Sequence, residues 1–202
     1  MTSRPSLESI SHPIAIVDPQ PEWANEFHAL AQEIERTLEN LALRVDHIGS
    51  TSVPGLPAKD IIDVQVTVGT LIERDEIAAR LQSIGYQLRA DIVWDHVPPG
   101  FESEATEHWA KLFFTAAPDK RAAHVHVREH GRYNERYALL FRDYLRAHPD
   151  AAAAYGRVKR QLAAIVVQDR DAYCSTKDPI CDLIMCAANE WQQARAPACG
   201  SV

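Results

Sequence analysis

The chain has 202 residues, of which 46% are hydrophobic and 24% are charged, and its net charge is −7. This length and apolar content suffice for one domain with a sizeable core. No apolar run reaches the roughly 20 residues that cross a bilayer. The negative charge argues against a protein that coats nucleic acid nonspecifically.

The ends of the chain differ from its middle. The N-terminal MTSRPSLESISHP lacks the apolar core of a secretory signal, so we expect a flexible leader over 1–12, one domain over 13–195 and a disordered tail over 196–202.

The cysteines fall in the last 30 residues without a C-x-x-C pair, at Cys174, Cys181, Cys186 and Cys199. Reduced thiols are therefore expected instead of a disulfide framework or a zinc site, and the cytoplasm is the expected compartment.

Hydrophobic spacing predicts a mixed β-sheet flanked by helices, with a helical C-terminal half. In chain order the expected elements are a helix at 21–41, strands at 43–48 and 62–68, a helix at 72–83, a short strand from Tyr86, a loop or lid at 91–107, strands at 109–115 and 123–129, and helices at 133–147, 150–168 and 171–194.

A Gly-Ser turn follows the first strand. Gly49 permits a tight backbone turn, and Ser50 and Thr51 add hydroxyls and N–H groups. Such a turn at a helix N-terminus is suited to holding a phosphate. Lys59 ends the loop that follows, where its ammonium group can reach the same phosphate.

The strand at 62–68 carries apolar residues on one face, while Asp63 and Gln65 project from the other. A carboxylate on a rigid strand opposite a phosphate-holding turn is typical of metal-assisted phosphoryl or nucleotidyl transfer. The alternative is a solvated strand face without chemistry.

His124 and His126 share one face of the 123–129 strand, roughly 7 Å apart. If that strand neighbours the 62–68 strand, two imidazoles face Asp63. They would then serve as metal ligands or as an acid–base pair for phosphate chemistry. The alternative is hydrogen bonding within the sheet face.

Basic residues are concentrated in one region. Residues 120–160 hold ten Lys or Arg against four Asp or Glu, which suits a compact anion better than a long polyanion. Arg142 and Arg146 lie one helical turn apart and can clamp an anion together. Either can equally pair with Asp143 or Asp150.

The segment HIGSTSVPGLPAKDIID resembles the signature of the GrpB-like family, which is assigned to the nucleotidyltransferase superfamily. The likeness extends to HVHV at 124–127 and FRDYLRAHPD at 141–150, and covers about residues 13 to 192. Members of this family stand alone or are fused to dephospho-CoA kinase. The resemblance implies a nucleotidyltransferase-like fold and a small anionic ligand, nucleotide or coenzyme-like. From hydropathy and charge we expect neither a membrane nor bulk nucleic acid as partner; an oligomer is compatible with the sequence.

The superfamily usually has Asp-x-Asp on the strand after the turn, and two Mg²⁺ ions align the reactants. Here the second position is Gln65, which adds no negative charge. The resemblance implies a divalent metal, Mg²⁺ or Mn²⁺ over Zn²⁺, held by Asp63, Gln65, His124 and His126. It also implies phosphate-binding roles for Lys159 and Lys177. Two alternatives stay open, namely a catalytically reduced binding module and a metal-dependent phosphohydrolase that uses His124 and His126.

Overall fold

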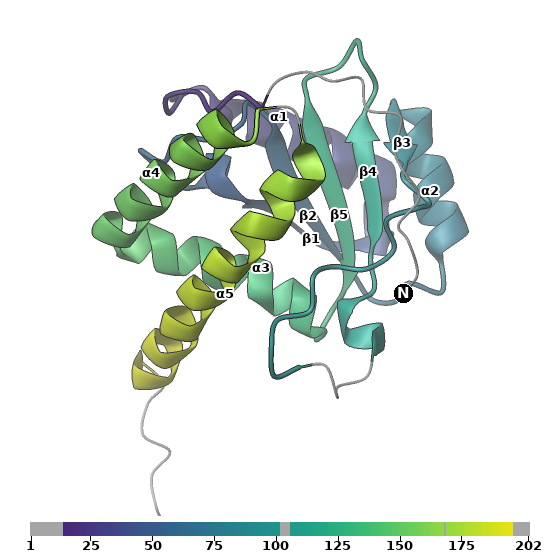
Figure 1. Cartoon of the computed structure of the whole chain (residues 1–202). Coiled ribbons are helices and arrows are strands. Elements are labelled where there is room, and N and C mark those ends of the chain that lie inside the picture. The colour runs from purple at the N-terminus through teal and green to yellow at the C-terminus, as the bar shows by residue number, and fades with distance from the viewer. Residues whose placement is uncertain (1–13, 102–105, 168, 196–202) are drawn as a thin grey trace, which may run out of the picture.

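The computed structural model describes residues 14–101, 106–167 and 169–195 (Figure 1). In chain order they form α1 (Trp23–Leu38), η1 (Glu39–Leu41), β1 (Ala42–Ile48), η2 (Ser50–Ser52), β2 (Ile62–Val68), α2 (Arg74–Ser83), β3 (Tyr86–Leu88), η3 (Thr106–Trp109), β4 (Leu112–Ala116), β5 (Ala123–Glu129), α3 (Tyr133–Ala147), α4 (Pro149–Ile165) and α5 (Arg170–Arg195), where η denotes a 3-10 turn. Within these residues no helix is long and apolar enough to span a membrane.

The strands form one mixed sheet in the order β1-β2-β5-β4-β3. The central pair, β2 and β5, is parallel, and the other neighbours are antiparallel. In the parallel register Asp63 lies beside His124 and Gln65 beside His126. Helices α1 and α2 lie behind the sheet in Figure 1, while α5 crosses in front of it. The two central strands therefore present one face to α1 and the opposite face to the C-terminal helices.

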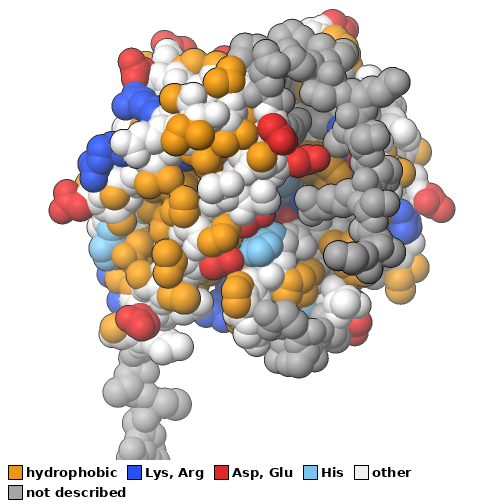
Figure 2. Space-filling model, viewed as in Figure 1, with side chains coloured by type: hydrophobic (Ala, Val, Ile, Leu, Met, Phe, Trp, Pro, Cys, Tyr) orange, Lys and Arg blue, Asp and Glu red, His pale blue; other side chains and the backbone are white. Residues whose placement is uncertain are grey.

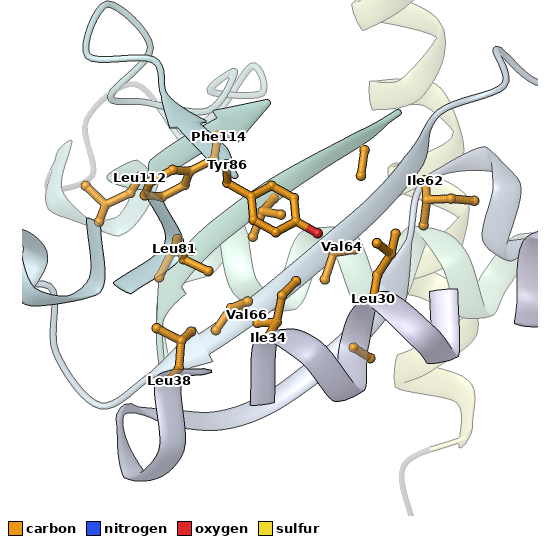
Figure 3. Packing of buried hydrophobic residues seen from close by; sticks show 14 of the residues in the cluster. Leu30, Ile34, Leu38, Ile62, Val64, Val66, Leu81, Tyr86, Leu112 and Phe114 are labelled. Carbon is orange, nitrogen blue, oxygen red and sulfur yellow. The ribbon is translucent and has the colours of Figure 1, made fainter. Parts of the chain in front are cut away.

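The main core lies between α1 and the sheet (Figure 3). Helix α1 turns its apolar stripe, which includes Ile34 and Leu38, towards Val64 and Val66 of β2, and all four side chains are fully buried. Burying a side chain of this size contributes about 1.5–3 kcal/mol. The alternation of β2 that buries these valines directs Asp63 and Gln65 to the opposite face.

A second cluster joins the C-terminal helices to the loop after the turn. Val53 and Leu56 pack with Leu145, Tyr155 and Cys181. Helix α4 approaches this loop closely at Gly156, where an added Cβ would lie 2.9 Å from Pro57 Cδ. The loop that follows the Gly-Ser turn thus packs against α3, α4 and α5.

The element boundaries differ from the predicted ones at several points. The first helix ends at Leu38 because Glu39 adopts a positive φ of 52°. The strand predicted at 109–115 begins only at Leu112, since Trp109 belongs to a 3-10 turn and packs in an aromatic cluster with Tyr133. The helix predicted at 150–168 ends at Ile165. The predicted leader and tail lie outside the described residues, as does Cys199; the other three cysteines are free thiols on α5.

Candidate functional site

The turn after β1 brings Gly49, Ser50 and Thr51 against β2. Gly49 has φ 68° and ψ −172°, a conformation essentially restricted to glycine. Ser50–Ser52 then form one 3-10 turn, closed by a hydrogen bond from Ser52 N to Gly49 O of 3.3 Å. No α-helix begins at this turn, because the chain continues from Val53 as an extended loop. A phosphate held here would depend on local N–H and hydroxyl groups instead of a helix dipole.

Arg142 and Arg146 support this turn from α3. Arg142 Nη1 donates to the carbonyl oxygen of His47 at 3.0 Å. Arg146 donates from Nε and Nη2 to the carbonyl oxygen of Ser52, at 3.0 and 2.8 Å. The structure therefore brings both arginines to the turn, where they bind its backbone oxygens.

His47 fixes the turn from the other side. Its Nε2 lies 3.0 Å from Thr51 Oγ1, and its ring stacks on Phe27 with centroids 4.5 Å apart. Burial lowers the pKa of His47 to about 4, although the charge of Asp63 acts to raise it. A neutral imidazole is thus built into the base of the turn.

Asp63, His124 and His126 come together on one sheet face. Asp63 Oδ1 lies 3.2 Å from His124 Nδ1 and 3.8 Å from His126 Nε2. Burial acts to raise the pKa of the Asp63 carboxyl, but the two histidines hold it well below its usual range. Burial also lowers the pKa of His126 to about 3. The site thus combines an ionised carboxylate, 28% exposed, with a neutral imidazole.

Gln65 lies on the same face but is fully buried and has other partners. Its Oε1 accepts a hydrogen bond from Arg128 Nη1 at 2.6 Å, and its Nε2 donates to the carbonyl oxygen of Glu135 at 3.3 Å. Arg128 is in turn bound by Asp95. Sequence reasoning missed both residues. Arg128 follows His126 by two positions on β5 and could have been found by alternation, whereas Asp95 lies in an irregular loop and gave no periodic signal.

The predicted basic residues of the loop and C-terminal helices form a lysine cluster, made of Lys59, Lys159 and Lys177. Lys159 is 3% exposed, and its Nζ donates to the carbonyl oxygen of Pro57 at 2.5 Å. Burial lowers the pKa of Lys159 to about 7, and the nearby charge of Lys177 lowers it further, while Asp63 acts to raise it. The Lys59 ammonium lies over the ring of Tyr173.

The ammonium group of Lys177, unlike that of Lys159, lies near groups that favour its charged form. Its Nζ is 3.4 Å from Cys181 Sγ and 3.6 Å from Asp178 Oδ1. Burial acts to lower the pKa of Lys177, but Cys181 and Asp178 raise it above its usual value. Tyr155 links this cluster to the turn, since its side chain contacts both Ser50 and Cys181.

A divalent cation needs several oxygen or nitrogen donors around it. Among the described residues, no three His, Cys, Asp or Glu side chains are arranged as a preformed metal site. Asp63 can still offer one carboxylate, and Mg²⁺ commonly binds one or two carboxylates together with substrate phosphates. The residues therefore fit one cation that arrives with a phosphorylated ligand.

The surface of this face is partly apolar. Figure 2 shows hydrophobic side chains gathered over the C-terminal helices, among which Ile165 and Leu183 are exposed. A surface pocket of about 430 Å³ lies elsewhere, beside α3 and the end of α5, with Leu139, Trp191 and Arg195 in its lining. None of the predicted site residues lines that pocket, so pocket size does not identify the chemistry here.

The chain matches the family model described as "GrpB protein" over residues 13–186. The chain belongs to the GrpB family. It is similar to a dephospho-CoA kinase of Mycolicibacterium paratuberculosis, with 38% identity over 83% of this chain but only 44% of that protein. The chain thus spans less than half the length of this relative.

Solved structures agree with the family assignment. The GrpB structure from Enterococcus faecalis has 32% sequence identity and a TM-score of 0.73, and covers 89% of this chain and 99% of that one. The GLD-2/RNP-8 complex has 13% identity and a TM-score of 0.50, over 78% of this chain and 57% of that one, which shows the fold alone. The predicted fold class, a mixed α/β sheet flanked by helices with a helical C-terminal half, is confirmed.

Proposed function

We propose that this GrpB protein binds a nucleotide or another phosphorylated small molecule between the Gly49–Thr51 turn and the lysine cluster. The observation that carries the proposal is the set of partners around the buried ammonium group of Lys159. Within the described part of the chain, its ammonium group has a carbonyl oxygen and the ring of Tyr155 as partners, but no carboxylate within ion-pair distance; Asp63 acts on it only from farther away. Burying a cation without a directly paired counter-charge is costly. A phosphate oxygen would supply that charge.

The turn supports the same ligand. Gly49 lets the Asp63 carboxylate pack against the turn, and Ser50 and Thr51 add hydroxyl and N–H groups next to that carboxylate. A divalent cation, Mg²⁺ or Mn²⁺, would bind Asp63 together with the ligand's phosphate oxygens. When bound, the cation would neutralise phosphate charge and polarise the P–O bond. His124 and His126 would hold the Asp63 carboxylate in its ionised state.

A second candidate is a binding module that does no chemistry. Gln65 favours it, because a buried amide bonded to Arg128 replaces the second carboxylate of the superfamily pattern. Similarity to a dephospho-CoA kinase makes a role beside coenzyme A synthesis a reasonable context for such a module. Both candidates bind the same ligand, but only the enzyme would convert it, so an assay of turnover distinguishes them.

A thermal-shift panel tests binding. It compares phosphate, pyrophosphate and nucleoside triphosphates, each with and without Mg²⁺ or Mn²⁺. A ligand at 100 times its Kd should stabilise the native state by about 2.7 kcal/mol. Lys159→Met should abolish the shift, and Lys120→Met should retain it, because Lys120 pairs with Glu33 of α1, away from the proposed site. Equal shifts in both variants would refute the proposed site.

A further inference from the structure

Beside the Asp63 site lies a buried charge cluster centred on Asp95. Arg128 donates from Nε to Asp95 Oδ2 at 2.8 Å and from Nη2 to Asp95 Oδ1 at 3.0 Å. Lys111 Nζ donates to Asp95 Oδ1 at 2.6 Å, and Asn134 Nδ2 donates to Oδ2 at 3.0 Å. Two cations thus share one carboxylate, so this cluster keeps a positive charge on the sheet face that carries Asp63.

Arg128 engages the atom that a second metal ion would need. In the superfamily pattern the residue two positions after the first carboxylate coordinates metal, and here that residue is Gln65. Its Oε1 already accepts a hydrogen bond of 2.6 Å from Arg128 Nη1. A guanidinium only donates hydrogen bonds and stays charged at all ordinary pH values. A divalent cation at Gln65 would therefore compete with the guanidinium for this oxygen and meet a fixed positive charge.

His126 is occupied by the same guanidinium. Its Nδ1 lies 3.4 Å from Arg128 Nη2. Because the guanidinium can only donate, Nδ1 must be the acceptor, and the proton of the neutral ring then lies on Nε2. That Nε2 faces Asp63 Oδ1 at 3.8 Å. Neither ring nitrogen then offers a free lone pair to a metal ion beside Asp63.

We propose that Arg128, held by Asp95, occupies the place of the second divalent cation, so that this site takes at most one metal ion. Arg128 acts through Gln65 and His126, which makes it a positioning residue. The residues of the chain do not fit the two-metal arrangement of the superfamily. The inference rests on the proposed function only for the location of the first cation at Asp63.

Titration of the full chain with Mn²⁺ alone tests the proposal. The sequence alone predicts that Gln65→Asp restores a carboxylate pair and tightens metal binding. We expect instead that the new carboxylate pairs with Arg128, so that the Mn²⁺ affinity of Gln65→Asp stays within about twofold of the wild type. Adding Arg128→Gln to Gln65→Asp should free the carboxylate pair and tighten Mn²⁺ binding at least tenfold.

The control is Gln65→Asp with Lys111→Met, which also removes one cation from Asp95 but leaves Arg128 beside residue 65. Its Mn²⁺ affinity should match that of Gln65→Asp. Tight Mn²⁺ binding by Gln65→Asp alone, or two ions on the wild type, would overturn the proposal. If the Arg128 double variant does not fold, Gln65→Asp alone still decides between these results.

Failure of the proposed function would look different. A chain that shows this Mn²⁺ pattern but no thermal shift with phosphate, pyrophosphate or nucleotides would disprove the ligand and retain the role of Arg128. A thermal shift with one of these ligands but without the expected Mn²⁺ pattern would support the ligand and disprove the role of Arg128.

Discussion

The side chain of Asp63 fills the space in which a side chain on Gly49 would lie. A Cβ atom added to Gly49 would approach Asp63 Cβ to 2.8 Å and Cγ to 2.9 Å. Gly49 therefore cannot gain a side chain unless the Asp63 side chain moves.

Gly49→Ala should destabilise the protein in two ways. The backbone at φ 68° would cost about 1–3 kcal/mol for a residue with a Cβ, and displacing Asp63 would add an overpacking cost of about 1–3 kcal/mol. Gly55→Ala is the matched control, since Gly55 also has a positive φ but nothing lies within 4 Å of its added Cβ. Urea unfolding should show a larger loss for Gly49→Ala. Equal losses of unfolding free energy in the two variants would mean that the Asp63 side chain moves aside without destabilising the protein.

Arg146→Met should lower the stability of the unliganded protein, because the carbonyl of Ser52 loses two hydrogen bonds from a charged group. We expect a loss of about 1–2 kcal/mol. Arg89→Met serves as control, since among the residues described the Arg89 side chain bonds only to Asp91 at the surface, and it should change stability by less than about 0.5 kcal/mol. An arginine that served only a ligand would leave the unliganded melting temperature unchanged, and that result would contradict this assignment.

The pKa of Lys159, about 7 in the folded protein against 10.5 for an ordinary lysine, predicts two opposite pH trends. Between these values the unfolded chain binds more protons, so the contribution of Lys159 to the free energy of unfolding should rise with pH. Anion affinity should fall over the same range, because the bound anion requires the protonated amine.

Sulfate is the suitable probe, since its charge is constant over this range. Its affinity should drop by up to tenfold per pH unit above about 7 in the wild type. In Lys159→Met both trends should disappear. A sulfate affinity that does not change with pH in the wild type would show that Lys159 does not bind the anion.

Asp95→Asn should be strongly destabilising, because it leaves Arg128 and Lys111 buried without their shared carboxylate. Removing one partner of such a buried pair costs about 3–5 kcal/mol. Asp91→Asn removes a carboxylate of the same loop, but its pair with Arg89 is exposed and contributes at most about 1 kcal/mol. Chemical denaturation of the two variants checks the difference. Similar losses would mean that water already screens the Asp95 cluster.

Strand alternation and helical spacing predicted the parts of the site that are regular. Asp63 and His126 lie on adjacent strands and one face, as the D-V-Q and H-V-H patterns predicted. The long helices of the C-terminal half were also predicted, because an amphipathic stripe repeats over many residues.

The remaining features depended on contacts that no local pattern encodes. Arg142 and Arg146 have the spacing of an anion clamp, but spacing cannot tell whether their partners are an anionic ligand or backbone carbonyl oxygens of the protein. The pairing of Gln65 with Arg128 joins residues of two strands, and its counter-ion Asp95 comes from a loop without periodicity.

The parallel pairing of β2 with β5 has a consequence for how the protein folds. Asp63 and His124 are hydrogen-bonded partners that are 61 positions apart in the chain, and the segment between them contains α2, β3 and β4. Contacts of such large sequence separation form slowly, because the entropy of closing the loop is lost before any pairing compensates for it. During refolding, α1 and the β1–β2 hairpin should gain hydrogen-exchange protection before the carboxylate and imidazole meet. A fluorescent nucleotide analogue should therefore bind, and change its fluorescence, only in the slowest folding phase.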